Sequence, residues 1–219
     1  MQLKAVLFDL DGTLVDSAPD LAAAGNTLRE SRGLPPLPAA QFRPMTSQGA
    51  RGMVGIALGL TPDNPDFEAA KADFLASYAQ RLTALTDVFT AMKPVIDRLD
   101  EAGFPWGIVT NKASRFTDPI VAALGLAERA QVVISGDTTP HAKPHPAPLL
   151  EAARRLGLPP SACLYAGDDL RDVQAGQAAG MQTVAVAWGY LGQDEPIDQW
   201  GADHCIEHPH ELLNLLPLP

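Results

Sequence analysis

The chain has 219 residues, 46% of them hydrophobic, so it is long enough to bury one large core and to carry a small inserted domain. Its formal net charge of −10 argues against nucleic acid or an anionic membrane as a partner, because both attract clustered Lys and Arg. The two cysteines, Cys163 and Cys205, have no CxxC spacing, and we find neither a signal-peptide pattern nor 18 consecutive apolar residues, so we expect a reduced, cytoplasmic protein without a disulfide framework.

Short apolar runs alternate with helical patterns along most of the chain. Each helical pattern has apolar residues on one face and a glycine directly after it, which is a common helix stop. Alternation of this kind implies right-handed βαβ crossovers, in which ligands bind at the carboxyl ends of the strands. We therefore predict an α/β fold with a Rossmann-like doubly wound parallel sheet. The predicted strands are residues 5–8, 106–110, 132–135, 163–166 and 183–187, and the predicted helices are residues 93–102, 116–124, 149–156 and 170–179.

The connection between the first two predicted strands is far too long for a single crossover helix, so it must contain structure of its own. Residues 21–32 have a helical pattern, and apolar residues recur on one face of a second, longer helix within residues 67–82. We expect residues 16–85 to form an all-helical cap over the strand ends. Residues 1–15 and 86–219 then form the α/β core.

The first predicted strand ends in two carboxylates, Asp9 and Asp11, one residue apart. Residues i and i+2 of a strand share a face, so both side chains leave the strand end together, and Gly12 allows a sharp turn there. Two acids at one place repel unless a positive group lies between them. A strand that runs into a polar turn explains an isolated D-x-D pair equally well, so the pair gains meaning only from the rest of the chain.

Two later strand ends also carry polar side chains. The second predicted strand is completed by Thr110 and Asn111, a hydroxyl and an amide that suit hydrogen bonds to phosphoryl oxygens, together with backbone N–H groups at the next helix start. A helix cap is the commoner role of such a threonine. After the third strand, Lys143 lies in a loop stiffened by two prolines, although most loop lysines are simply solvated.

The fourth predicted strand is followed by three acids at a helix start, Asp168, Asp169 and Asp172. Capping and the helix dipole explain one or two of them but do not need all three. With the first pair of acids they bring much negative charge to a site where a phosphate dianion must also bind. Only a hard divalent cation and a fixed ammonium group make this tolerable. We therefore predict an Mg²⁺ site in which Lys143 supplies the ammonium.

These strand ends closely resemble the four motifs of the haloacid dehalogenase superfamily of phosphohydrolases. The resemblance covers essentially the whole chain. The insertion after the first motif lies where the subgroup that contains phosphoglycolate phosphatases has a helical cap. The matching segments are residues 9–13 for the first motif, Thr110 for the second, Lys143 for the third and residues 167–172 for the fourth.

The resemblance implies a phosphoric monoester hydrolase with a two-step mechanism, which the residues support independently. Asp9 attacks phosphorus to form an aspartyl-phosphate, while Asp11 protonates the leaving alkoxide and then takes a proton from the attacking water. Superfamily enzymes that cleave carbon–halogen bonds lack this second acid. Thr110, the Asn111 backbone and Lys143 stabilise charge on the transferring phosphoryl group.

The same resemblance implies how Mg²⁺ is held. Its ligands are the carboxylates of Asp9 and Asp168 and the backbone carbonyl of Asp11. Asp172 holds a metal-bound water or orients Lys143. The role of Asp169 stays open.

The segment 46–52 of the predicted cap is the candidate substrate-binding loop. Gln48 and Gly49 offer small hydrogen-bonding groups, and the guanidinium of Arg51 suits a substrate carboxylate. A glycine-rich turn between helices, with its arginine in solvent, is the alternative.

Wider similarity favours one substrate over another. We expect N-acetylmuramic acid 6-phosphate slightly ahead of 2-phosphoglycolate, although both carry a carboxylate and Arg51 does not separate them. The segments that resemble the N-acetylmuramic acid 6-phosphate phosphatases of peptidoglycan recycling are residues 109–116, 167–172 and 200–203.

Two other functions share part of the pattern. A sugar phosphomutase of the β-phosphoglucomutase type has the same core and the second acid, but its cap residues are not clearly present. A receiver-like phosphoacceptor also combines an acidic Mg²⁺ pocket with a Thr and a Lys, but the helical insertion argues against it. We expect a small-molecule phosphate ester as the partner, and a monomer or homodimer.

Overall fold

The computed structural model describes residues 2–191 and 195–218. The chain forms two compact units. The α/β unit comprises Met1–Val15 and Val88–Pro219, and the helical unit comprises Asp16–Asp87. The chain therefore re-enters the α/β unit at residue 88, where the sequence pattern predicts residue 86.

A six-stranded sheet forms the centre of the α/β unit. Its strands are β1 (Ala5–Phe8), β4 (Trp106–Val109), β5 (Val132–Ile134), β6 (Cys163–Gly167), β7 (Gln182–Val186) and β8 (His204–Ile206). Their order is β5-β4-β1-β6-β7-β8, and every neighbouring pair is parallel. The strand order changes direction between β1 and β6, which is where ligands bind in folds of this kind.

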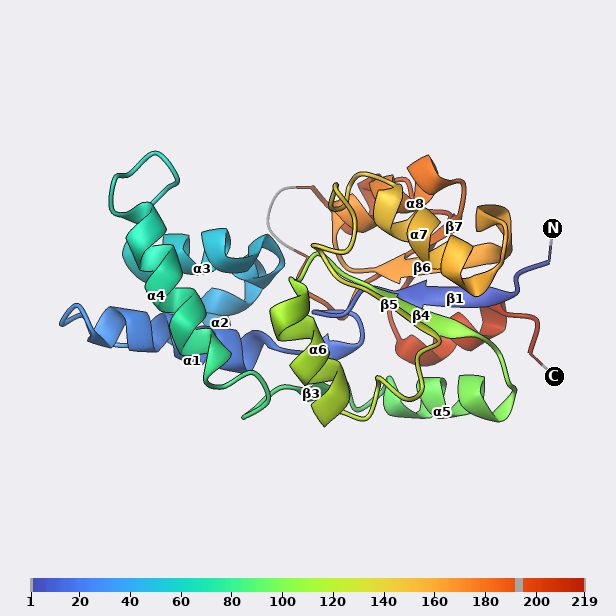
Figure 1. The fold of residues 1–219 in the computed structure, drawn as a ribbon, viewed down its shortest axis with the longest axis horizontal. Helices are drawn as coiled ribbons and strands as arrows, with labels where there is room; N and C mark the ends of the chain where they lie inside the picture. Colours follow the sequence, from blue (N-terminus) through green and yellow to red (C-terminus); the bar gives the residue numbers. More distant parts are fainter. Residues whose placement is uncertain (1, 192–194, 219) are drawn as a thin grey trace. The chain divides into compact units, whose positions relative to one another are not determined.

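Helices cover both faces of this sheet. They are α5 (Lys93–Glu101), α6 (Ser114–Ala123), α7 (Ala147–Leu156) and α8 (Leu170–Ala179). In Figure 1, α5 and α6 lie on one face and α7 and α8 on the other. The predicted doubly wound parallel fold is thereby confirmed.

The buried strands explain why their sequences are continuous apolar runs. Every residue of β1 and β4 is buried, as parallel strands covered on both faces require. Phe8 and Trp106, from these two strands, pack edge to face with ring centroids 6.2 Å apart. The edge strand β8 was not predicted, because only Ile206 of its three residues is buried and no apolar run marks it.

The helical unit is built from four α-helices and one 3₁₀ helix. They are α1 (Ala18–Glu30), α2 (Ala39–Phe42), the 3₁₀ helix Arg43–Gln48, α3 (Gly49–Leu58) and α4 (Phe67–Ala79). Helix α1 packs against α2, α3 and α4, and the side chains of Phe42, Met53 and Phe74 are fully buried in this unit. Leu82 lies outside α4, so the predicted apolar stripe extends past the end of the helix.

One buried acid fixes the end of the helical unit. The Oδ2 atom of Asp20, in the first turn of α1, accepts hydrogen bonds from the backbone N–H groups of Leu85 and Thr86 and from the Thr86 hydroxyl, all at 2.8 Å. These bonds satisfy the Oδ2 atom of a carboxylate that is 0% exposed, and they tie the last turn of the unit to its first helix; Arg81 Nε lies 3.6 Å from the other oxygen, Oδ1.

Two further features complete the fold. The two-residue strands β2 (Val15–Asp16) and β3 (Asp87–Val88) form a separate two-stranded sheet. Among the described residues, every helix is too short or too polar to cross a membrane.

Candidate active site

Polar side chains from four loops meet at the carboxyl end of the sheet. Asp9 directly follows β1, Thr110 follows β4, and Asp168 follows β6. Lys143 lies in the loop between β5 and α7. Because neighbouring strands are parallel, their ends bring residues more than a hundred positions apart to one place.

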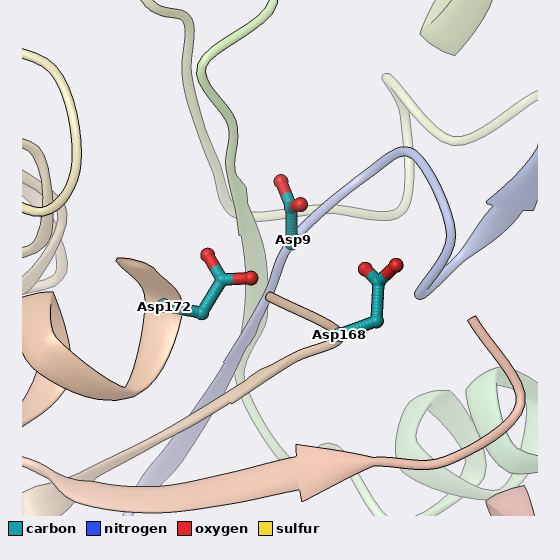
Figure 2. Close-up of side chains that lie close together, drawn as sticks. All are labelled: Asp9, Asp168 and Asp172. Atoms are coloured by element: carbon teal, nitrogen blue, oxygen red, sulfur yellow. The ribbon is translucent and has the colours of Figure 1, made fainter. Parts of the chain in front are cut away.

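Three carboxylates form the centre of this site. Figure 2 shows Asp9, Asp168 and Asp172 with their side chains close together, and one oxygen from each lies within 4.8 Å of the others. Asp168 and Asp172 are 1% and 2% exposed. Acids buried this close together repel one another strongly unless protons or cations neutralise them.

Asp168 is held on every side by the turn that follows β1 and by the segment after β7. Its Oδ1 accepts a hydrogen bond from the Thr13 hydroxyl at 2.8 Å, and its Oδ2 accepts one from the Tyr190 backbone N–H at 2.6 Å. Gly12 has φ +85°, and a Cβ atom there or on Gly189 would collide with the Asp168 side chain. Burial, followed by the charges of its acidic neighbours, raises the pKa of Asp168 well above its ordinary value.

The two other acids of this helix start have distinct positions. Asp169 is the N-cap of α8: its Oδ1 accepts a hydrogen bond from the Arg171 backbone N–H at 2.9 Å, and its carboxylate also pairs with the Arg171 guanidinium. Asp172 closes the capping box, because its Oδ2 accepts from the Asp169 backbone N–H at 3.1 Å. The Oδ1 atom of Asp172 lies 2.7 Å from Lys143 Nζ. Asp169 therefore caps α8 and pairs with Arg171, and Asp172 contacts both the helix start and Lys143.

Lys143 is the buried cation of the site. Its Nζ lies 2.7 Å from Asp172 Oδ1 and 2.9 Å from Asp9 Oδ1, and the residue is 5% exposed. Burial alone would lower the pKa of Lys143, but the charges of Asp172 and Asp9 outweigh this effect and raise it. Lys143 is therefore a charged ammonium directly against the Asp9 carboxylate.

The Asp9 carboxylate has the properties expected of a metal ligand. Burial raises the pKa of Asp9 to about 7; the positive charge of Lys143 opposes this shift, and the negative charge of Asp172 adds to it. Its Oδ1 is buried, and the Lys143 ammonium lies 2.9 Å from it as an ion pair. A buried carboxylate beside those of Asp168 and Asp172 is suited to a hard divalent cation.

Asp11 has a cationic neighbour that the sequence analysis missed. Lys112 Nζ lies 3.0 Å from Asp11 Oδ2, with side chains 9% and 18% exposed. The backbone of Lys112 is fixed, because its N–H donates to the Thr110 hydroxyl and its carbonyl accepts from the Gly136 N–H and the Thr117 hydroxyl. In the sequence, only the position of Lys112 two residues after Thr110 indicated that it belongs to this site.

The charged groups of the site carry a net negative charge. The four acids Asp9, Asp11, Asp168 and Asp172 face the ammonium groups of Lys143 and Lys112, so four negative and two positive charges leave an excess of two negative charges when all are ionised. A divalent cation cancels this excess. The donor set, all carboxylate oxygens, therefore fits a metal such as Mg²⁺.

The amide of Asn111 braces the lysine loop. Its Nδ2 donates to the Lys143 carbonyl and its Oδ1 accepts from the Lys143 N–H, both at 2.9 Å. The Thr110 side chain is buried, and its backbone N–H donates to Ile134 O at 2.9 Å. The Asn111 side chain thus positions Lys143, and only its backbone stays available for the predicted contact with a phosphoryl group.

The three cap candidates lie in the helical unit. Gln48 ends the 3₁₀ helix, Gly49 begins α3 with φ +59°, and Arg51 is in the first turn of that helix. All three are exposed. The segment predicted as the substrate-binding loop thus joins the 3₁₀ helix to α3, with Arg51 at the surface of the unit.

The sequence matches one family model along most of its length. The model is described as haloacid dehalogenase-like hydrolase, and it matches residues 6–186.

Two curated relatives span nearly the whole chain. N-acetylmuramic acid 6-phosphate phosphatase of Pseudomonas aeruginosa is 43% identical over 99% of this chain and 96% of its own length. Phosphoglycolate phosphatase of Xanthomonas campestris pv. campestris is 46% identical over 95% of this chain and 94% of its own length. Among solved structures, a predicted phosphoglycolate phosphatase from Haemophilus somnus is 29% identical, with a TM-score of 0.85 and 98% of both chains covered.

Proposed function

This chain belongs to the haloacid dehalogenase-like hydrolases and is a phosphoric monoester hydrolase, and we propose that it hydrolyses a small phosphorylated metabolite with Mg²⁺ through a phosphorylated Asp9. The observation that carries this proposal is the contact between the Lys143 ammonium and Asp9, beside two more buried carboxylates at the reversal point of the sheet. That combination gives a nucleophile, a fixed cation and a metal site in one place.

In the first step, an Asp9 carboxylate oxygen forms a bond to phosphorus while the bond from phosphorus to the substrate oxygen breaks. Asp11 gives its proton to that leaving oxygen, so the alcohol departs neutral. The Lys143 ammonium and the backbone N–H groups after Thr110 offset the charge on the phosphoryl oxygens. Lys112, 3.0 Å from Asp11, keeps that carboxylate in a fixed orientation.

In the second step, a water molecule attacks the phosphorus of the aspartyl-phosphate. Asp11, now a carboxylate, takes the proton from the water, and the bond between phosphorus and Asp9 breaks to release inorganic phosphate. The enzyme thereby returns to its starting state, in which Asp11 carries the proton for the next cycle.

The metal ion is assigned to a defined set of residues. In this proposal Asp9, Asp168 and the backbone carbonyl of Asp11 hold Mg²⁺, and Asp172 orients Lys143. When bound, the ion supplies positive charge that stabilises the phosphoryl oxygens during transfer.

The substrate is proposed on narrower grounds. The Pseudomonas relative is named for N-acetylmuramic acid 6-phosphate and the Xanthomonas relative for phosphoglycolate, at similar identity. We rank the amino-sugar phosphate slightly first, and 2-phosphoglycolate is the alternative. Arg51, with Gln48 and Gly49, is the proposed site for the carboxylate that both substrates carry.

One segment that resembles the amino-sugar phosphatases has a structural explanation. Asp203 Oδ2 accepts hydrogen bonds from the Thr183 backbone N–H and hydroxyl, at 2.8 and 2.9 Å, and Trp200 is buried. Residues 200–203 thus secure the edge of the sheet, and their likeness carries little weight for the substrate.

Phosphate release from both compounds, measured side by side with Mg²⁺, tests the proposal. A preference in kcat/KM of more than about 100-fold, roughly 2.7 kcal/mol of transition-state discrimination, identifies the substrate class. Preference for the amino sugar supports our ranking, and preference for phosphoglycolate reverses it. Low rates on both would contradict the proposed role of the segment 46–52 while leaving the phosphatase chemistry to be tested on other esters.

A further inference from the structure

Two ammonium groups of the described residues lie at the strand ends, and they contact different acids. Lys143 Nζ lies 2.9 Å from Asp9, the attacking group, and 2.7 Å from Asp172. Lys112 Nζ lies 3.0 Å from Oδ2 of Asp11, the acid assigned to the leaving oxygen. Lys112 is therefore the cation on the leaving-group side of the proposed reaction.

The Lys112 ammonium is restricted from both ends of its side chain. The backbone N–H donates to the Thr110 hydroxyl at 3.2 Å, and the backbone carbonyl accepts from the Thr117 hydroxyl at 3.0 Å. The side chain is 9% exposed, and its charged end is paired with Asp11. A charge that is positioned before the substrate arrives costs little further ordering when the substrate binds.

This position determines which part of a substrate Lys112 meets. A general acid must lie within about 3.2 Å of the oxygen that it protonates. Since Lys112 Nζ is 3.0 Å from one oxygen of Asp11, it then lies within about 8 Å of the leaving oxygen, whichever of the two carboxylate oxygens gives the proton. An anionic group close to the ester oxygen is thereby brought next to Lys112.

The two candidate substrates differ at this point of their structures. The carboxylate carbon of 2-phosphoglycolate is two bonds from the ester oxygen. In N-acetylmuramic acid 6-phosphate it is seven bonds away, across the sugar ring. When the ester oxygen contacts Asp11, only the first carboxylate must therefore lie near Lys112.

The charge of such an ester calls for a cation on this side of the site. Lys143 and the metal ion are assigned to the phosphoryl group, so a carboxylate beside the leaving oxygen needs a positive group of its own. The pairing of Lys112 with Asp11 leaves room for this, because one ammonium can contact two carboxylates at once. Lys143 does so with Asp9 and Asp172.

We propose that Lys112 is a specificity-determining residue that pairs with a substrate carboxylate on the carbon next to the ester oxygen, and so favours phosphate esters of α-hydroxy acids. The inference rests on the function proposed above and names a substrate class for the same site. The two oxygens of that carboxylate allow Lys112 and Arg51 to bind it together. The contribution of Lys112 to these esters does not depend on which candidate substrate the whole site prefers.

The substitution Lys112→Met tests this with two esters that differ only in the carboxylate. Ethyl phosphate has a methyl group where 2-phosphoglycolate has its carboxylate. Loss of the contact with Asp11 should lower kcat/KM for both by a common factor. We expect 2-phosphoglycolate to lose at least about tenfold beyond that factor, because a charge-assisted hydrogen bond is lost as well. N-acetylmuramic acid 6-phosphate should lose the common factor only.

Lys71→Met is the matched control, because it removes one ammonium group and changes the net charge by the same amount. Lys71 pairs with Glu68 at 3.2 Å on the surface of the helical unit. The ratio of kcat/KM between 2-phosphoglycolate and ethyl phosphate should stay within about twofold in this variant. A larger change would mean that the overall charge of the protein, and not Lys112, selects the acidic ester.

Binding without turnover gives a second readout. In the Asp9→Asn background with Mg²⁺, calorimetric titration should show that Lys112→Met weakens binding of 2-phosphoglycolate at least about tenfold more than binding of ethyl phosphate. A role confined to orienting Asp11 would change both affinities alike.

The unsubstituted enzyme provides a test that does not depend on the folding of any variant. Its kcat/KM for 2-phosphoglycolate should exceed that for ethyl phosphate at least about tenfold. A smaller ratio would overturn the inference, because the site would then not recognise the carboxylate.

The outcomes distinguish this inference from the proposed function. If the unsubstituted enzyme releases phosphate, and Lys112→Met lowers kcat/KM for 2-phosphoglycolate and ethyl phosphate by factors that differ less than about tenfold, the specificity role is wrong and the phosphatase function stands. If the unsubstituted enzyme releases phosphate from no tested ester, the proposed function is wrong, and so is a role for Lys112 in it.

Discussion

The strand ends of the α/β unit and the start of α3 in the helical unit are constrained very differently. Asp168, Asp172 and Lys143 are at most 5% exposed, and each has several hydrogen-bonded or charged partners. Gln48 and Arg51 lie on the exposed surface of their unit. Breaking a buried charge pair costs several kcal/mol, whereas an exposed turn tolerates many side chains. We therefore expect substitutions at the strand ends to change the rate of phosphoryl transfer, and substitutions at the start of α3 to change the substrate preference.

The largest expected effect is at the nucleophile. Asp9→Asn should reduce phosphate release from every ester by more than about 10⁴-fold, because an amide cannot form the covalent intermediate. The fold should persist, since the amide removes a carboxylate whose pKa burial raises to about 7, and with it repulsion from Asp172. Steady-state rates and the Tm of the metal-free protein check both statements. An undiminished rate in a folded variant would show that Asp9 is not the nucleophile.

The groups around Asp9 also show how much of the fold and of the site can be predicted from the sequence alone. The sheet, the insertion and the acids at the strand ends could be predicted, because buried strands leave apolar runs and each motif lies directly after its strand. Asp9 and Asp168 were identified in this way, whereas Lys143 was identified from its proline-flanked loop between β5 and α7. The edge strand β8 was missed because two of its three residues, His204 and Cys205, are not buried.

Contacts between distant residues could not be predicted in the same way. Tyr165 looks like an ordinary apolar residue of a strand, and only the fold places its hydroxyl 2.7 Å from Lys143. The side chain of Asn111 fits a phosphate contact by sequence, yet it bonds to the backbone of Lys143, 32 positions away. Such pairs depend on the register of neighbouring strands, which no local pattern expresses.

The stability of the metal-free protein should depend on pH because burial raises the pKa of an acid in the site. In the metal-free protein, the pKa of Asp9 is raised to about 7 by burial, against the opposing charge of Lys143. An unfolded Asp ionises near pH ~4, so the folded state keeps a proton that the unfolded chain has lost. The stability of the metal-free protein should therefore fall as the pH rises through this interval.

Mg²⁺ needs the ionised carboxylates, so below about pH 7 its apparent affinity should weaken about tenfold for each pH unit. The difference in Tm between Mg²⁺ and EDTA, measured near about pH 5.5 and about pH 8, tests this: the increment should be larger at the higher pH. Asp9→Asn is the control, and its increment should depend less on pH. Equal increments in the unsubstituted protein would contradict the assignment of Asp9 as a metal ligand.

The smallest expected effect concerns the helical unit, and it sharpens the contrast with the strand ends. Arg51→Ala should raise KM about tenfold for N-acetylmuramic acid 6-phosphate or 2-phosphoglycolate, because a charge-assisted hydrogen bond to their carboxylate contributes about 1.5 kcal/mol. p-Nitrophenyl phosphate has no carboxylate, so its KM and kcat should stay unchanged.

Arg32→Ala is the matched control, because this arginine belongs to the same unit and pairs at its surface with Asp73 at 3.0 Å. It should leave the kinetics of all three esters as they are. If Arg51→Ala changes p-nitrophenyl phosphate as much as the carboxylate-bearing esters, the arginine supports the fold of its unit and does not select the substrate. If it changes none of them, residues other than those at the start of α3 determine the substrate specificity. The buried catalytic residues would then have to be compared with those other residues.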